Sequence, residues 1–157
     1  MTEPLRSFDD FYLVEYPRLL RVLTAADSSA ADALQEAFTK AAAAWPQVSA
    51  YEHPAAWVRQ VAVRRMLNER RSTQRRDAAL ERLAAVAPAD SVDREELLDL
   101  AMAIDTLPTR QRIAVTLFYL GGLTSAETAA AMDISAGAVR FHLHEARNRV
   151  REILGAR

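Results

Sequence analysis

Side chains suited to contacting nucleic acid recur along one face of a helix near the C-terminal end of the sequence. Apolar residues at spacings of three and four predict a buried stripe, formed by Val139, Leu143, Ala146, Val150 and Leu154. The opposite face then carries charged, amide and aromatic groups: Arg140, Phe141, His144, Glu145, Arg147, Asn148 and Arg151. The N-terminal members of such a face can read base edges in the major groove, and the later arginines can contact phosphates. The alternative is a solvated face with no ligand.

A helix-turn-helix is the predicted support for that face. Thr124 and Glu127 have the T-x-x-E spacing of a capping box, which starts a short helix over about 125–132. A tight turn of three residues follows, and Ser135 can cap the next helix, over about 136–153. In this motif the second helix enters the major groove of duplex DNA. The pattern therefore predicts that the C-terminal part of the chain binds duplex DNA.

A second basic surface is predicted in the first half of the chain. Residues 57–76 carry seven basic side chains and one acidic one, and they follow a loop, 46–54, that holds an exposed aromatic residue. Single-stranded nucleic acid is bound by such combinations, because basic groups follow the backbone while aromatic rings receive unstacked bases. The residues expected to do this are Tyr51, Arg59, Arg64, Arg65 and Arg71. Trp45 and Trp57 are assigned to the core.

The elements that position these side chains are predicted to be helices. Half of the 157 residues are apolar, and only four glycines and six prolines are present, which favours an all-α fold. The expected helices start at a Ser7 N-cap, then span 29–44, 55–75, 93–105, 108–120, 125–132 and 136–153. Pro17 predicts a kink or a break in the first helix, near Glu15 and Tyr16.

Two small helical domains joined by an acidic linker are the predicted organisation. The domains comprise residues 1–76 and 93–157, and the linker comprises 77–92, where the helical period is lost. Residues 77–105 carry eight acidic and two basic side chains. This charge suggests that the acidic stretch lies against the basic helix in the free protein.

Several classes of function are disfavoured by the composition. The chain has no cysteine, and its three histidines, His53, His142 and His144, lack the spacing of metal ligands, so no metal site is expected. No phosphate loop or catalytic cluster is recognisable, so neither a cofactor nor an enzymatic activity is expected. No apolar run approaches the roughly 18 residues of a membrane span, and no signal peptide is evident. A cytoplasmic location is therefore expected.

Over nearly its whole length the chain resembles the extracytoplasmic-function (ECF) sigma factors of bacteria, group 4 of the sigma-70 family. In the first half, DALQEAFTKAAAAW and HPAAWVRQVAVRRMLNERR resemble the region 2 helices of that family. In the second half, LPTRQRIAVTLFYLGGLTSAETAAAMDISAGAVRFHLHEAR resembles region 4 with its recognition turn. The order of these pieces and their separation by an acidic stretch make the joint match specific.

The resemblance implies a subunit that directs core RNA polymerase to promoters. The helix with Asp32, Gln35, Glu36 and Phe38 would dock on the clamp helices of the largest polymerase subunit. The loop 46–54 and the basic helix would melt and hold the minus-10 element of promoter DNA. Region 4 would read the minus-35 element and touch the polymerase flap. An anti-sigma factor is a further partner that the resemblance allows.

Some positions depart from the family pattern and leave promoter preference open. They are Thr128, Ala138 and Glu145 in the second half, and Arg64 and Asn68 in the first. The C-terminal third alone also resembles the LuxR-type helix-turn-helix of stand-alone duplex-binding regulators, which is the main alternative. The helical and basic first half speaks against that alternative. A second alternative is an interaction protein that keeps the fold without promoter activity.

Overall fold

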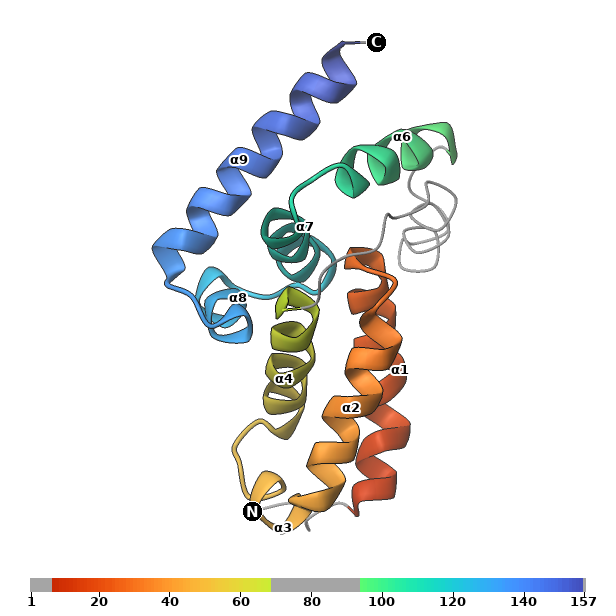
Figure 1. Ribbon diagram of the computed structural model, residues 1–157, viewed down its shortest axis with the longest axis vertical. Coiled ribbons are helices and arrows are strands. Elements are labelled where there is room, and N and C mark those ends of the chain that lie inside the picture. The colour runs from red at the N-terminus through yellow and green to blue at the C-terminus, as the bar shows by residue number, and fades with distance from the viewer. Residues whose placement is uncertain (1–6, 69–93, 157) are drawn as a thin grey trace.

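The computed structural model describes residues 7–68 and 94–156, which form helices and connecting turns (Figure 1). The first stretch contains α1 (Phe8–Ala26), α2 (Ala30–Ala43), the short α3 (Trp45–Val48) and α4 (Pro54–Asn68). The second contains α6 (Arg94–Asp105), α7 (Thr109–Val115), the π-helix η1 (Thr116–Leu120), α8 (Ser125–Met132) and α9 (Ala136–Gly155). No strand occurs in these two stretches, and the all-α prediction is confirmed. The predicted linker 77–92 lies outside the described residues.

Helix α1 begins where the sequence predicts and continues through its proline. The Ser7 hydroxyl accepts a hydrogen bond from the backbone N–H of Asp10 at 3.2 Å, which caps the helix. The predicted break near Pro17 is wrong, because α1 is one helix over all 19 residues. Pro17 and Leu13, four residues earlier, are both exposed, so water can serve the carbonyl that the proline leaves without a helical donor.

The predicted loop over 46–54 is shorter in the structure. Helix α2 ends at Ala43, and Pro46 then lies in the first turn of α3, where its missing N–H has no helical partner to lose. Only the segment between α3 and α4 is non-helical, and Tyr51 lies there with 39% of its surface exposed. Pro54 begins α4, one residue before the predicted start, which brings Tyr51 close to the start of the basic helix.

One hydrophobic core joins the two halves of the described chain. Buried side chains of the first half, such as Leu23, Phe38 and Val58, belong to the same cluster as Ile113, Leu117 and other residues of the second half. Helix α8 packs against α4, and η1 packs against α1 (Figure 1). The described parts of the two predicted domains, 1–76 and 93–157, therefore share one hydrophobic core.

A buried arginine ties the two parts together. Arg112 of α7 is fully buried, and its Nε donates to the backbone carbonyl of Ala26 at the end of α1, at 2.5 Å. Its Nη1 donates to the carbonyl of Leu107 at 2.9 Å, and its Nη2 lies 3.7 Å from a carboxylate oxygen of Asp27. Because a guanidinium presents several donors in a rigid fork, this one side chain satisfies acceptors from both halves of the chain.

The C-terminal end of α9 is less buried than the apolar period predicts. Val139, Leu143 and Ala146 are buried, but Val150 is half-buried and Leu154 is 38% exposed. Figure 1 shows the C-terminal end of α9 extending beyond α7, so within the described residues its last turns are covered less than its start. The predicted helix 108–120 is also divided, because α7 ends at Val115 and η1 continues it as a π-helix.

Candidate nucleic-acid interface

The helix-turn-helix forms with the predicted caps. The Thr124 hydroxyl accepts from the backbone N–H of Glu127 at 3.1 Å, and the Glu127 carboxylate accepts from the backbone N–H of Thr124 at 3.1 Å. These hydrogen bonds hold the pKa of the Glu127 carboxyl below its usual value. Asp133 then takes a left-handed conformation (φ 57°), which turns the chain, and the Ser135 hydroxyl caps α9 by accepting from Ala138. The capping box and the second cap are confirmed.

The N-terminal half of α9 presents most of the residues predicted to contact duplex DNA. Arg140, Phe141 and His144 are exposed, and Phe141 has 60% of its surface open to solvent. An amide nitrogen of Asn148 lies 3.2 Å from Nε2 of His144, so these two groups form one polar patch. Glu145 is half-buried beside them. The ring centroid of Phe141 lies 5.8 Å from that of His142, and most of the Phe141 ring remains open to a partner.

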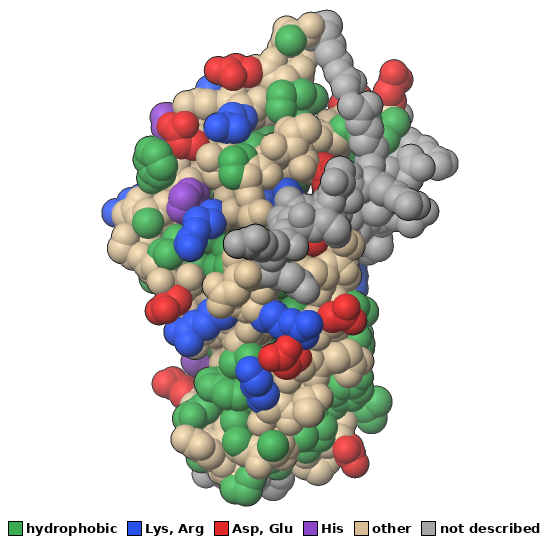
Figure 2. All heavy atoms as spheres, viewed as in Figure 1, with side chains coloured by type: hydrophobic (Ala, Val, Ile, Leu, Met, Phe, Trp, Pro, Cys, Tyr) green, Lys and Arg blue, Asp and Glu red, His purple; other side chains and the backbone are tan. Residues whose placement is uncertain are grey.

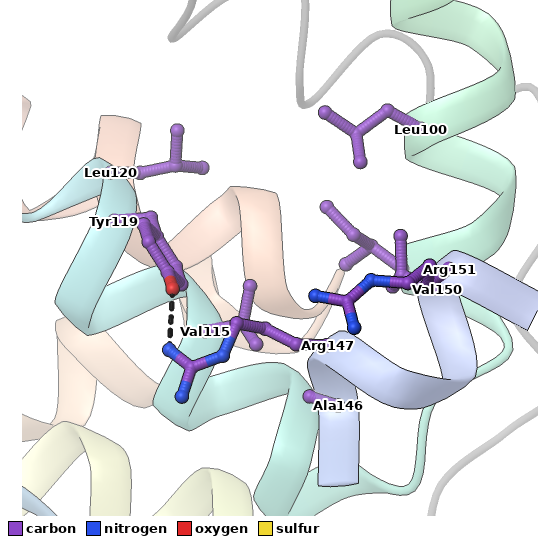
Figure 3. A pocket seen from close by; sticks show the side chains of 9 residues that line it. Leu100, Val115, Tyr119, Leu120, Ala146, Arg147, Val150 and Arg151 are labelled. Atoms are coloured by element: carbon purple, nitrogen blue, oxygen red, sulfur yellow. Dashed lines mark hydrogen bonds between the residues drawn. The ribbon is translucent and has the colours of Figure 1, made fainter. Parts of the chain in front are cut away.

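Arg147 points to a different place from the other predicted DNA-contacting residues. Its guanidinium donates to the hydroxyl of Tyr119 in η1 at 2.7 Å, as Figure 3 shows. Arg147 and Arg151 lie at the edge of an apolar groove of 410 Å³ between α6, the end of α7, η1 and the later part of α9. The apolar residues that line this groove are Leu100, Ile104, Val115, Leu120, Ala146 and Val150. Sequence reasoning missed this groove, because its lining comes from four separate elements.

The basic residues of α4 are engaged with neighbouring helices. Arg65 lies 2.6 Å from the Glu36 carboxylate and donates to the carbonyl of Asp32 at 2.9 Å, both in α2. Arg64 lies 3.3 Å from the Asp133 carboxylate in the turn of the helix-turn-helix. Arg71 lies outside the described residues. On the face shown in Figure 2, basic and acidic side chains accordingly lie next to one another around the middle of the molecule.

Arg59 is half-buried between the two parts of the chain. Burial lowers the pKa of its guanidinium, while the carboxylates of Glu127 and Glu15 act to raise it. Its Nε is buried without a hydrogen-bond partner in the part of the chain that the structure describes. Arg59 also lines a cavity of 270 Å³ whose walls include Tyr51 and Trp57 on one side and Ala130 and Ala131 of α8 on the other.

Three of the four α2 residues predicted to dock on polymerase are accessible at the surface of the helix. Asp32 and Gln35 are exposed on α2, and Glu36 is half-buried between Lys40 and Arg65. The Gln35 amide donates to the hydroxyl of Tyr16 at 3.2 Å. Phe38 is only 2% exposed and packs against the rings of Phe11, Tyr12 and Tyr16, so it supports this surface from below and cannot contact a partner directly.

Other kinds of site are not found in the described ranges. No group of three or more His, Cys, Asp or Glu side chains there could hold a metal ion. Within the same ranges, no helix is both long and apolar enough to cross a membrane. The acidic stretch predicted to cover the basic helix lies mostly outside these ranges, and its described part, α6, packs against α9.

Comparisons with known proteins agree with this geometry. Residues 13–76 match the family described as sigma-70 region 2, and residues 97–150 match sigma-70 region 4. The RNA polymerase sigma-E factor of Streptomyces avermitilis is 30% identical, over 82% of this chain and 72% of that protein. The sigma-E factor of Streptomyces coelicolor is 31% identical, over 82% of this chain and 73% of that protein.

A solved structure has the same fold. It is the sigma factor RpoE in complex with the anti-sigma factor NepR from Bartonella quintana, with a TM-score of 0.65 and 23% identity. The match covers 94% of this chain and 96% of that one.

Proposed function

Since this chain belongs to the ECF group of the sigma-70 family of RNA polymerase sigma factors, we propose that it binds core RNA polymerase and opens promoters by melting the minus-10 element and reading the minus-35 element. Sigma factors are initiation factors and not enzymes, so selectivity must come from binding alone. Opening then results from capture of unpaired bases rather than from a covalent step.

Reading of the minus-35 element is assigned to the N-terminal half of α9. The observation that carries this assignment is the pair Arg140 and Phe141, both exposed directly after a capped helix start. Arginine contacts guanine edges, and an apolar ring can pack on a thymine methyl. His144, Glu145 and Asn148 extend the same face, and Glu145 can accept from a cytosine amino group. Arg147 is better placed for the groove beside Tyr119 than for bases.

Capture of the minus-10 element is assigned to Tyr51 and the basic face of α4. Tyr51, which is partly exposed, lines the same cavity as Trp57 and Arg59. The ring centroids of Tyr51 and Trp57 lie 6.4 Å apart. An unstacked base can be received by such rings while arginines contact its phosphates. Arg59 and Arg64 are the described residues that supply this charge, and Arg71 is assigned the same role by its sequence position.

Docking on polymerase is assigned to two surfaces. Asp32, Gln35 and Glu36 of α2 form a polar surface that suits the clamp helices of the largest subunit. The apolar groove edged by Arg147 and Arg151 suits the polymerase flap, because an amphipathic helix lays its apolar side into such a groove. The structural relative is bound to the anti-sigma factor NepR, and an anti-sigma factor that bound these two surfaces of this chain would keep it from polymerase.

A stand-alone LuxR-type regulator is not favoured. Such a regulator would have no need of a polymerase-docking helix, and the first half of this chain matches sigma-70 region 2 over residues 13–76.

Replacing Arg140 with alanine should weaken minus-35 recognition by about 1–3 kcal/mol, since one arginine contact with a base edge is lost. The measurement is binding of the reconstituted holoenzyme to duplex promoters, first selected with the unmodified protein from a random pool. Arg149→Ala is the matched control, because Arg149 is also exposed on α9 but lies on the opposite side of the helix from Arg140. Equal losses for both variants would mean that α9 contributes general charge and no base reading.

A further inference from the structure

We infer that Tyr12 and Tyr16 of α1 are positioning residues for docking on polymerase: their hydroxyls orient the side-chain amide of Gln35 so that its oxygen faces outward as a hydrogen-bond acceptor. The inference rests on the docking role proposed for α2, and it goes further by naming the residues of α1 that prepare this surface. The two tyrosines act through Gln35, and the inference assigns them no contact with polymerase.

The side chain of Gln35 is exposed on α2, but its amide nitrogen is directed back toward α1. This nitrogen donates to the hydroxyl of Tyr16 at 3.2 Å and to the hydroxyl of Tyr12 at 3.4 Å. An amide nitrogen carries two N–H donors, and each of them has an acceptor in this arrangement. The amide oxygen, an acceptor with two lone pairs, is thereby turned away from the tyrosines.

Packing of the aromatic rings holds the two hydroxyls in place. The rings of Tyr12 and Tyr16 stack with their centroids 4.9 Å apart and an interplanar angle of 19°. The buried ring of Phe38 lies edge-on to both of them, at centroid distances of 5.1 and 5.7 Å. Aromatic side chains rotate about only two χ angles, so such packing fixes them at a low cost in entropy. Phe38, which cannot reach a partner, therefore supports the hydroxyls that orient Gln35.

The oriented oxygen of Gln35 lies on a face whose other free group is also an acceptor. Asp32 is exposed three residues earlier on α2, and residues three apart share one face of a helix. The Glu36 carboxylate has Lys40 at 3.2 Å from one oxygen and Arg65 at 2.6 Å from the other. A group of polymerase that binds Asp32 and Gln35 together must therefore supply N–H or O–H donors. An amide that rotated freely would present either end and would lose more rotamer freedom on docking.

Removing the two hydroxyls while keeping both rings tests the inference. Tyr12→Phe/Tyr16→Phe should weaken binding of the full chain to bacterial core RNA polymerase by about two- to tenfold, the usual effect of one hydrogen bond. Biolayer interferometry with immobilised polymerase would measure the Kd, and circular dichroism would show that the variant is folded. Thr24→Val is the matched control, because it removes a hydroxyl of α1 that donates to the carbonyl of Leu20, and it should leave the Kd unchanged.

A double-mutant cycle with Gln35 distinguishes positioning from other roles of the hydroxyls. Gln35→Ala should weaken polymerase binding by at least about fivefold. Adding Tyr12→Phe and Tyr16→Phe to that variant should change the Kd no further, because the hydroxyls act only through the amide. A structural role of the hydroxyls, or a contact of their own with polymerase, would instead weaken binding by the same factor in both backgrounds.

Charged replacements of Gln35 test whether its oxygen is the group that polymerase binds. A glutamate keeps two acceptor oxygens, to which the tyrosine hydroxyls can donate, whereas a lysine carries donors alone. We expect Gln35→Glu to keep the Kd within about threefold of the unmodified chain and Gln35→Lys to raise it at least about tenfold.

The outcomes separate this inference from the proposed function. An unchanged Kd for Tyr12→Phe/Tyr16→Phe, equal effects of the two phenylalanines in both backgrounds, or equal losses for Gln35→Glu and Gln35→Lys would overturn the positioning role. Each of these results leaves the sigma function intact as long as the unmodified chain binds polymerase. Failure of the unmodified chain to bind would contradict the proposed function, and the inference with it.

Discussion

Replacing Arg112 with methionine is expected to lower the free energy of unfolding by about 3–5 kcal/mol, the range seen when one member of a buried ion pair is removed. Methionine can fill much of the volume but cannot donate to the carbonyls of Ala26 and Leu107. It also removes the guanidinium beside the buried Asp27 carboxylate. Buried acceptors that lose their donors carry the desolvation cost that the arginine now offsets.

Urea denaturation followed by circular dichroism would measure this loss. Arg110→Met is the matched control, because Arg110 is exposed on the same helix and its replacement should change stability by no more than about 0.5 kcal/mol. If both variants had the same midpoint, Arg112 would not join the two parts of the chain in solution.

Replacing Phe38 with alanine is the second change expected to have a large effect, about 3–5 kcal/mol of stability. Phe38 is 2% exposed, and its ring centroid lies 5.7 Å from that of Phe11 and 5.1 Å from that of Tyr12. Alanine would leave a cavity that helices α1 and α2 can close only in part. Thermal unfolding would show the loss as a lower Tm.

Phe38→Leu distinguishes a packing role from a docking role. Leucine keeps most of the buried apolar volume, so this variant should be destabilised less and should still bind polymerase at a temperature where it is folded. If folded Phe38→Leu lost polymerase binding while keeping its stability, the ring itself would have to contact the partner, contrary to its burial.

The sequence correctly predicted those features of the helix-turn-helix that are set by residues three or four positions apart. The capping box of Thr124 and Glu127, the Ser135 cap and the buried start of α9 are set by spacings of three and four residues, and all three are present. The break predicted as one outcome at Pro17 is absent, because an exposed helix position tolerates a missing hydrogen bond that a buried one would not. The prediction failed at Leu154 because helix periodicity cannot show where the packing partner ends.

Contacts between the two parts of the chain could not be predicted in the same way. Phe38 lies beside Asp32 and Gln35 in sequence, and only its burial separates support of the docking surface from contact with a partner. Arg112 lies next to Ile113 and Ala114 in an apolar stretch, which was a signal that this arginine could be buried. Its acceptor on Ala26 is 86 residues away, so no local pattern could identify it.

The most direct test of the central claim is binding of the purified chain to bacterial core RNA polymerase by size-exclusion chromatography. Asp32→Arg/Gln35→Ala changes two exposed residues of the α2 docking surface, and Glu152→Arg is a charge-reversal control on α9. We predict that the unmodified chain and Glu152→Arg elute with polymerase and that the α2 variant, still folded, elutes alone. Absence of the unmodified chain from the polymerase peak, combined with salt-dependent binding of duplex DNA by the free chain, would contradict the account and favour a stand-alone regulator.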